Sequence, residues 1–383
     1  MERDLILIST SLFTWGIGEG LFFYFLPLSL QDWGANPLLI GAVYSGIGVA
    51  IAVAQIPAGY LSDRIGARYI MYASWVIGVL ATWIMALAQS LTAFVIGVWI
   101  YYLTAFVVAP MNSYITQIRG KWSVSRALTF SAGAFNLGAV AGPILGGLIA
   151  DHLGIQRIYL FSAIIFIIST MIIFFLKSRK VAIVGEIKDD THLLRNRRYV
   201  MFLVLSFFAI MFVYLPQPLT PNYLQDQVLL NRTTIGLLGT IGNIGNAFAT
   251  LILGSLPATF GLFLGQIMVA AFAVLLWKGH STFSFGLAYF LLGGWRLNRS
   301  MIVSKVRSFI REKEVGLAFG ILETVSGIAI ILTPIAAGWI YSQNAALIYP
   351  IGFGMICLAI IANGLFFYVF RSNSSDKKNC HAS

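Results

Sequence analysis

The hydrophobic positions of this chain fall in long unbroken runs, separated by short polar segments. A helix needs about 20 apolar residues to cross the hydrocarbon core of a membrane. Twelve runs reach that length, at 5–30, 38–61, 70–89, 91–117, 127–150, 157–176, 199–222, 233–254, 260–277, 282–303, 315–341 and 346–370. The pattern predicts an all-α membrane protein with twelve transmembrane helices.

The longest polar segment, residues 177–198, separates six runs from six, and it predicts two six-helix bundles joined by a cytoplasmic linker. The expected bundles are residues 1–176 and 199–371, followed by a cytoplasmic tail at 372–383. Glycines repeat across the linker at an offset of 195, and the segments GPILGG and TPIAAG repeat at an offset of 191. Two similar bundles with the same orientation predict pseudo-symmetry about an axis along the membrane normal, with a site near the midplane.

Charge supports this topology and fixes its expected orientation. Charged side chains make up only 10% of the 383 residues, against about 25% in soluble domains. If both termini are cytoplasmic, 20 of the 25 Lys and Arg residues fall in cytoplasmic segments and three face outward. The net charge of +11 then follows from the positive-inside rule, which argues against nucleic-acid binding. The sequence therefore predicts a multi-pass protein of the plasma membrane.

The loop after the second run reads GYLSDRIGAR. Glycines permit a tight turn, and a carboxylate there can cap a helix N-terminus. The motif consists of Gly59, Leu61, Asp63, Arg64, Gly66 and Arg68. It resembles the signature of the major facilitator superfamily, secondary transporters with two six-helix halves. The resemblance covers the whole chain in span count, loop charge and internal repeat, and it implies a transporter that works by alternating access.

The resemblance also implies a role for Asp63. In the family this aspartate docks against the cytoplasmic start of the eleventh span when the inner gate is closed, and here that span would begin near Val315 and Gly316. The repeated segment GSLPATFG, at 254–261, keeps the glycines but carries no charge. We therefore expect the inner gate to be asymmetric. The other interpretation is a positively charged loop with an incidental aspartate.

A second motif lies on the fifth run. Glycines spaced four apart form a smooth stripe that lets another helix approach closely, and a proline bends the helix. The motif consists of Gly138, Gly142, Pro143, Gly146 and Gly147. It resembles the superfamily's antiporter motif, found mainly in proton-coupled exporters, although close packing alone is the alternative reading. The fourth run carries no charge, whereas many proton-coupled members have an arginine there.

Ionisable residues inside a span are costly and usually mark function. They are Glu19 in the first run, Arg296 and Arg299 in the tenth, and Glu323 in the eleventh. Arg299 and Glu323 lie at similar depth, so they can form an ion pair. A carboxyl group in apolar surroundings can exchange a proton near neutral pH, which makes Glu19 the candidate for proton coupling. The alternative is a neutral Glu19 hydrogen-bonded between helices.

Polar residues within the runs are further candidates for lining a cavity, although each alone is more often an interhelical hydrogen bond. These are Gln55, Asn112, Asn136, Gln217, Asn222, Asn243 and Asn246. Four aromatic residues, Trp15, Tyr24, Tyr101 and Tyr102, are candidates for stacking on a substrate, but we expect interfacial or lipid-facing positions for them.

Three functions remain open at this point. The first is proton-coupled export of amphipathic organic compounds, and the second is import or exchange of an anionic metabolite through Arg296 and Arg299. The third is a membrane sensor or scaffold without transport. The four histidines are scattered and the two cysteines lack metal-ligand spacing, so we expect no enzyme, no cofactor and no metal site. The expected partners are a small-molecule substrate, a proton and the lipid bilayer, with a monomeric protein.

Overall fold

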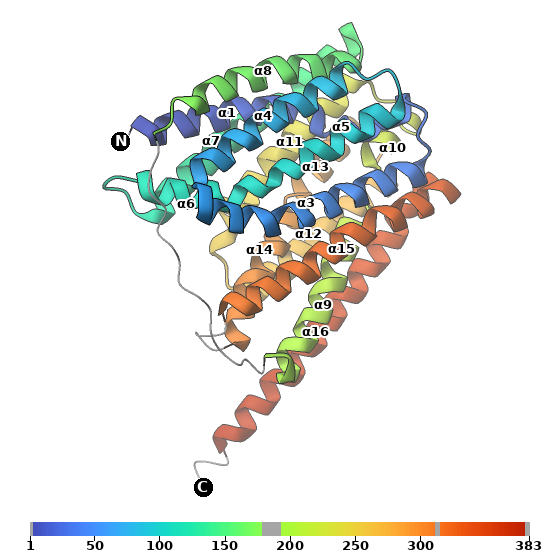
Figure 1. Ribbon diagram of the computed structural model, residues 1–383. Coiled ribbons are helices and arrows are strands. Elements are labelled where there is room, and N and C mark those ends of the chain that lie inside the picture. Colours follow the sequence, from blue (N-terminus) through green and yellow to red (C-terminus); the bar gives the residue numbers. More distant parts are fainter. Residues whose placement is uncertain (1–2, 178–192, 311–314, 380–383) are drawn as a thin grey trace. The chain divides into compact units, whose positions relative to one another are not determined.

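Figure 1 shows the computed structural model, which describes residues 3–177, 193–310 and 315–379. Within these ranges the side chains of residues 55–63, 125, 194, 315–316 and 370–379 lie outside the description. Every regular element in the described ranges is a helix. The α-helices are α1 (Arg3–Phe23), α2 (Leu26–Asp32), α3 (Pro37–Ile65), α4 (Ala67–Ala86), α5 (Leu91–Leu103), α6 (Val108–Ile118), α7 (Val124–Leu153), α8 (Gln156–Phe174), α9 (Arg197–Tyr214), α10 (Thr220–Asp226), α11 (Arg232–Leu251), α12 (Ala258–Lys278), α13 (Thr282–Leu291), α14 (Gly294–Val306), α15 (Val315–Gln343) and α16 (Ile348–Asn379).

Eleven segments of the described chain are long and apolar enough to cross a membrane. One of them, Leu91–Ile118, joins α5 and α6 through a 3-10 turn. The expected tenth span is present but is interrupted at Leu292 and Gly293, so that α13 and α14 contain 10 and 13 residues. This break separates the apolar half of the span from the half that carries Arg296 and Arg299.

The first and seventh expected spans are broken in the same way. A short helix follows each long one, α2 after α1 and α10 after α9, and each short helix has a proline in its first turn. Proline fits the first turn of a helix because its missing N–H would have no partner there. The starts of α2 and α10 are separated by nearly the same interval as the glycine repeat, so the breaks belong to the repeated architecture.

The chain divides into two compact units. Unit 1 contains Met1–Asp189, Pro218–Ile244 and Pro334–Ala345, and unit 2 contains Asp190–Gln217, Gly245–Thr333 and Ala346–Ser383. Unit 1 therefore holds the first six spans together with α10, most of α11 and the C-terminal part of α15. The predicted bundle limits at the linker stay a prediction.

The core of unit 1 forms around α1, which packs along α7 and α8, while α4 packs on α8 and α5 (Figure 1). Trp15 of α1 stacks on Phe166 of α8 with ring centroids 4.0 Å apart, and Tyr101 of α5 is nearly parallel to Phe166. Trp15 and Tyr101 are buried, so their expected lipid-facing placement is wrong. Large rings are most stable where both faces are removed from solvent, and here the bundle interior provides that environment.

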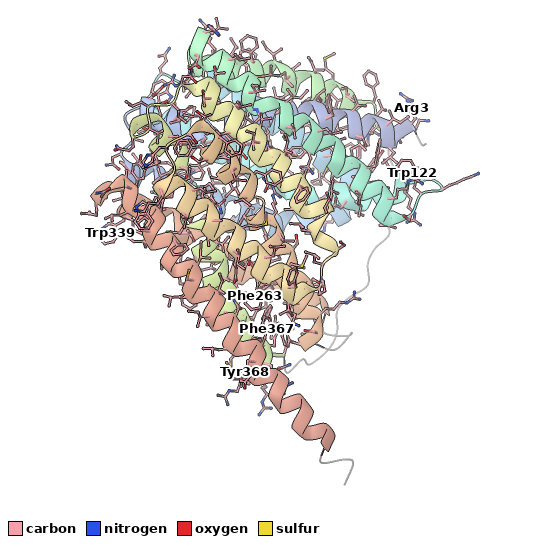
Figure 2. The ribbon with its side chains drawn as sticks, turned by 180° about the vertical axis from the view of Figure 1, so that it is seen from behind. Arg3, Trp122, Phe263, Trp339, Phe367 and Tyr368 are labelled. Atoms are coloured by element: carbon pink, nitrogen blue, oxygen red, sulfur yellow. The ribbon has the colours of Figure 1, made fainter. Side chains whose placement is uncertain are left out.

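In unit 2, α12 packs against α14 and α16. Gly265 allows α14 to approach, since a Cβ at that position would lie 2.8 Å from the backbone nitrogen of Asn298. Phe263 of α12 meets Phe367 of α16 at 6.1 Å between ring centroids, as Figure 2 shows. The interior of this unit is therefore a helix-packing core of its own.

Candidate functional site

The glycine stripe of α7 faces α1. A Cβ added at Gly138 would lie 2.1 Å from the carbonyl oxygen of Phe13, and one at Gly146 would lie 2.1 Å from that of Leu21. Gly142 is opposite Gly20, with the added Cβ 2.4 Å from its Cα. These distances are too short for any side chain, so the stripe brings the two backbones into direct contact. The last glycine of the motif, Gly147, faces α11 instead, where an added Cβ would lie 2.6 Å from the carbonyl oxygen of Arg232.

Pro143 bends α7 where it meets α11. The proline has no N–H to donate to the carbonyl oxygen of Ala139, four residues earlier. Asn243 of α11 supplies the missing donor, with its Nδ2 2.7 Å from that oxygen. Thr240 donates its hydroxyl to the next carbonyl oxygen, that of Val140, at 2.9 Å. The bend in α7 is thus stabilised by side chains from the other half of the sequence.

The beginning of α11 is held by acidic residues of the first half. The Asp151 carboxylate accepts from the backbone N–H of Arg232 at 3.2 Å and from that of Thr233 at 2.8 Å. The Arg232 guanidinium pairs with Asp32 at 2.7 Å. The first N–H groups of a helix lack partners within the helix, and the N-terminal end favours negative charge, so Asp151 caps α11.

An equivalent crossing joins α15 to α3. A Cβ at Gly41 would lie 2.2 Å from the carbonyl oxygen of Pro334, just as one at Gly236 would lie 2.2 Å from that of Pro143. A Cβ at Gly338 would lie 2.5 Å from the carbonyl oxygen of Pro37. Backbone contact therefore occurs at both crossings within unit 1.

Glu19 lies on α1 within the interior of unit 1 and is half-buried. The Tyr101 hydroxyl donates to its Oε2 at 2.7 Å. The same hydroxyl accepts from the indole N–H of Trp15 at 3.1 Å. These three side chains form a directed chain of donors that ends at the carboxylate, and chains of hydrogen bonds strengthen one another in a medium of low dielectric constant.

The aromatic wall behind Glu19 is fixed by close packing and by hydroxyl groups. A Cβ at Gly78 would lie 2.3 Å from the Trp15 ring, so only glycine leaves room for this indole. Trp75 lies tilted against Trp15 and donates to Ser11 at 2.9 Å and to Ser169 at 3.0 Å. Because these neighbours hold both tryptophans, the Tyr101 hydroxyl meets Glu19 in a defined position.

The expected pair between Arg299 and Glu323 is confirmed, with Nη2 and Oε2 2.8 Å apart in unit 2. The two side chains are 41% and 53% exposed, so the charges neutralise each other without being buried. Arg296 lies on the same helix, α14, and is exposed. The structure therefore links Arg299 to an acid rather than leaving two free cations side by side.

The polar candidates do not gather into one site. Asn112 and Asn136 are exposed on α6 and α7. Gln217 follows α9 and donates to the carbonyl oxygen of Val213 at 2.7 Å, and Asn243 donates to Ala139 at the bend in α7. Asn246 keeps a buried Oδ1 without a hydrogen-bond partner in the described structure.

Asn222 is buried, and its Nδ2 donates to the carbonyl oxygen of Pro27 at 3.1 Å. The side chain of Gln55 lies outside the description.

The cytoplasmic motif is described only in part. The contacts of Gly59, Leu61 and Asp63 lie outside the description, as do those of Val315 and Gly316. Gly66 has φ +92°, a conformation that favours glycine, and it begins α4. Arg68 donates to the Tyr72 hydroxyl at 2.6 Å, which in turn donates to the carbonyl oxygen of Phe174 at 2.9 Å. The docking of Asp63 stays a prediction.

Sequence reasoning missed Asp151 and Thr240, and it named Trp15 and Tyr101 without placing them beside Glu19. Pro143 alone could have indicated part of the missing set, because the carbonyl four residues before a helical proline needs an outside donor. Nothing in the spacing of Tyr101 indicated that its hydroxyl meets Glu19.

The described geometry can be compared with known proteins. The sequence profile of the Major Facilitator Superfamily matches residues 8–217 and 202–381. A "Tetracycline resistance protein, class H" of Pasteurella multocida is 23% identical over 90% of this chain and 91% of its own length. A "Multidrug resistance protein MdtG" of Proteus mirabilis is 25% identical over 68% of this chain and 65% of that protein.

An uncharacterized MFS-type transporter of Methanocaldococcus jannaschii is 28% identical over 45% of each chain, so this match spans about half of that relative. Among solved structures, the nucleoside transporter NupG superposes with a TM-score of 0.79, covering 96% of this chain and 99% of that chain. A POT family peptide transporter superposes with a TM-score of 0.74 over 96% and 97%. At sequence identities of 15% and 12%, these two structures show only that the fold is shared.

Proposed function

Since the chain belongs to the major facilitator superfamily and is a membrane transporter rather than an enzyme, we propose that it is a proton-coupled exporter of amphipathic organic compounds. The proposal rests on one observation, the half-buried Glu19 carboxylate that accepts the Tyr101 hydroxyl inside unit 1. Glu19 is the coupling residue, and the proton it carries in one direction drives the substrate in the other. The protein acts in the plasma membrane, with both termini cytoplasmic, as a monomer.

The site around Glu19 suits a group that gains and loses a proton. In the ionised state the carboxylate accepts from the Tyr101 hydroxyl, and in the protonated state a carboxylic acid can donate to an acceptor such as a hydroxyl oxygen. Trp15 holds that oxygen in place in both states. Aromatic faces and one carboxylate are also the groups that bind a lipophilic cation, so proton and substrate can compete for the same acid.

The names of two relatives support export over import. One is a tetracycline resistance protein and the other a multidrug resistance protein. The alternative, carriage of an anionic metabolite, needs arginines that present their charge to the substrate. Arg299 instead forms an ion pair with Glu323, which weakens that alternative.

The test is transport in proteoliposomes with an imposed pH gradient, using the lipophilic cation ethidium as the probe. Glu19→Gln keeps the size of the side chain and its ability to accept from Tyr101, but it cannot carry a proton. We expect gradient-driven ethidium movement to be abolished while ethidium binding in detergent persists.

Tyr101→Phe is the second variant, and Tyr159→Phe is its matched control. Tyr159 is a buried tyrosine of the same unit whose hydroxyl donates to Ser29 at 2.8 Å, away from Glu19. Tyr101→Phe should weaken gradient-driven transport, and Tyr159→Phe should leave its pH dependence unchanged. Full gradient-driven transport by Glu19→Gln would show that another residue carries the proton.

A further inference from the structure

A small cavity of about 190 Å³ lies in unit 1, between the short helices α2 and α10 and the ends of α3 and α15. Part of its lining is apolar, including Ile40 and Leu219. The remainder is polar and comes from Gln31, Asn222, Asp226 and Tyr341. At about 30 Å³ for each water molecule, the space is enough for a molecule of a few heavy atoms.

Two polar atoms of this lining are buried without a hydrogen-bond partner. One is Oδ1 of Asn222, a residue that is 1% exposed, and the other is the hydroxyl of Tyr341, which is 8% exposed. The amide of Asn222 is held in its orientation because Nδ2 donates to the carbonyl oxygen of Pro27 and to Oε1 of Gln31. Oδ1 of Asn222 is therefore a hydrogen-bond acceptor in a fixed position, and a bound molecule with an N–H or O–H can donate to it.

The acceptors in this cavity outnumber the donors. Gln31 donates from Nε2 to the Asp226 carboxylate at 2.7 Å. This N–H is therefore not available to a bound molecule. Asp226 is the only charged residue of the lining, and it carries negative charge. A guest that donates several hydrogen bonds and carries positive charge fits this set.

An ammonium group fits better than a metal ion. Calcium, for example, takes six to eight oxygen ligands, and the polar groups free to bind a guest here are fewer. An ammonium group has three N–H donors, which matches Asn222 Oδ1, the Asp226 carboxylate and the Tyr341 hydroxyl. The apolar lining at Ile40 and Leu219 suits a short aliphatic chain attached to that group.

The cavity lies where equivalent positions of the internal repeat meet. Asn222 bonds to Pro27, and Asp226 bonds to Gln31, and in both pairs the positions differ by 195, the offset of the internal repeat. Contacts between equivalent positions of two related halves occur where the pseudo-twofold axis passes between them. In transporters built from such repeats the substrate path follows that axis.

We propose that this cavity binds the ammonium group of a small aliphatic amine, at the end of the spans that the charge distribution predicts to be extracellular. The occupant joins α2 and α10 to Tyr341 of α15 and thereby holds these helices together. Its site is separate from Glu19, and the proposal holds whether or not Glu19 carries the coupling proton.

The test uses the purified full-length chain in detergent and n-butylammonium chloride as the probe, with binding followed by calorimetric titration and thermal unfolding. 1-Butanol has nearly the same shape without charge, and sodium chloride at equal concentration controls for ionic strength. We expect saturable binding and a raised unfolding temperature with n-butylammonium alone. Equal effects from 1-butanol or sodium chloride, or no saturable binding, would overturn the proposal.

Two variants locate the site. Asp226→Asn removes the charge and should weaken n-butylammonium binding about tenfold, equivalent to about 1.4 kcal/mol. Tyr341→Phe removes a hydroxyl that has no hydrogen-bond partner in the described structure, so it should weaken amine binding without lowering the unfolding temperature of the amine-free protein. Tyr368→Phe is the control, because Tyr368 lies on α16, is 76% exposed and lies outside the cavity (Figure 2).

Unchanged affinity in both Asp226→Asn and Tyr341→Phe would contradict the assignment. Glu19→Gln should bind n-butylammonium as tightly as the unaltered protein. Loss of amine binding in Glu19→Gln would place the amine at the coupling residue and refute a separate site.

Discussion

Helices α7 and α15, which carry Pro143 and Pro334, make the same backbone crossing in unit 1 but differ in what holds it. In both, the proline carbonyl oxygen rests on a glycine of the partner helix, Gly236 for α7 and Gly41 for α15. The two glycines are 195 positions apart, and the two prolines are 191 apart, so the crossings are copies of one arrangement. The close approach of the backbones was kept in both copies.

Two polar groups of the first crossing have no counterpart at the equivalent positions of the second. At the first crossing Asn243 satisfies the bend of α7, and Asp151 caps α11. The repeat offsets place Gly48 at the position equivalent to Asn243 and Ser342 at the position equivalent to Asp151. The Ser342 hydroxyl donates to Trp339 of its own helix. We therefore expect the crossing of α15 on α3 to separate more readily than that of α7 on α11.

The cytoplasmic motif shows the same inequality in the sequence, since GYLSDRIGAR carries charges and its copy GSLPATFG has none. In each case the repeat keeps the glycines that permit close packing, and the first copy carries amide or charged side chains where the equivalent positions of the second copy have none. Close packing determines where two helices meet, and directional polar contacts determine how much free energy their separation requires. We therefore predict that the two copies of the repeat pack their backbones alike but differ in the polar contacts that control opening.

The largest effects should come from the glycines, and they should be equal at the two crossings. Gly236→Ala and Gly41→Ala each place a Cβ 2.2 Å from a proline carbonyl oxygen. Overpacking of this kind costs about 1–3 kcal/mol. Thermal unfolding in detergent should show similar losses for both variants, together with reduced transport.

Gly133→Ala on α7 and Gly327→Ala on α15 are the controls, because an added Cβ at either position meets nothing within 4 Å. Alanine is the better helix former, so these variants should unfold at the same temperature as the unaltered protein or slightly above it. A large loss of stability in Gly236→Ala and none in Gly41→Ala, or the reverse, would show that the two crossings are not equivalent.

The next effect is confined to the first crossing. Asn243→Leu removes the donor to Ala139 and the acceptor of the Tyr24 hydroxyl, at a cost of about 1–3 kcal/mol for buried groups left without partners. Pro143→Ala restores an N–H that can bond to Ala139 within α7. In that background Asn243→Leu should cost less, as a double-mutant cycle on unfolding free energy will show. An equal cost in both backgrounds would mean that Asn243 does not serve the bend.

The smallest effect is expected from Asp151, which caps the start of α11, in comparison with Ser342 at the equivalent position. Loss of an N-terminal cap costs about 0.5–2 kcal/mol, so Asp151→Ala should lower the free energy of unfolding by about that amount. Ser342→Ala at the equivalent position should cost less, because its hydroxyl bonds only within α15. The comparison is made by chemical or thermal unfolding at matched ionic strength. Equal losses would indicate that Ser342 stabilises its crossing as much as Asp151 stabilises the other.

Most of the fold could be predicted from the hydrophobic runs, because a lipid environment demands about 20 apolar residues for each span. The breaks at 24–25 and 292–293 could not, since their residues are as apolar as the helices around them, whereas Pro216 and Pro218 are a local signal for the break at 215–219. The pairing of Arg299 with Glu323 was predictable from equal depth within one bundle. The expected docking of Asp63 stays a prediction.

The contacts of Glu19 were beyond the sequence for a different reason. An isolated acid in an apolar run is visible by its charge, but its partner depends on which face of α5 meets α1. Tyr101 is one aromatic residue among many, and nothing local distinguishes it. Asn243 was visible as a polar residue within a span, yet its role follows only from the place where α11 crosses the proline of α7.

The most direct test of the central claim is proton release on substrate binding. The purified protein is held in weakly buffered detergent solution with a pH-sensitive dye, and ethidium is added. If Glu19 exchanges a proton for the substrate, the unaltered protein will release protons as ethidium binds, and Glu19→Gln will bind ethidium without releasing any. Equal proton release from both proteins would contradict the assignment of Glu19 as the coupling residue.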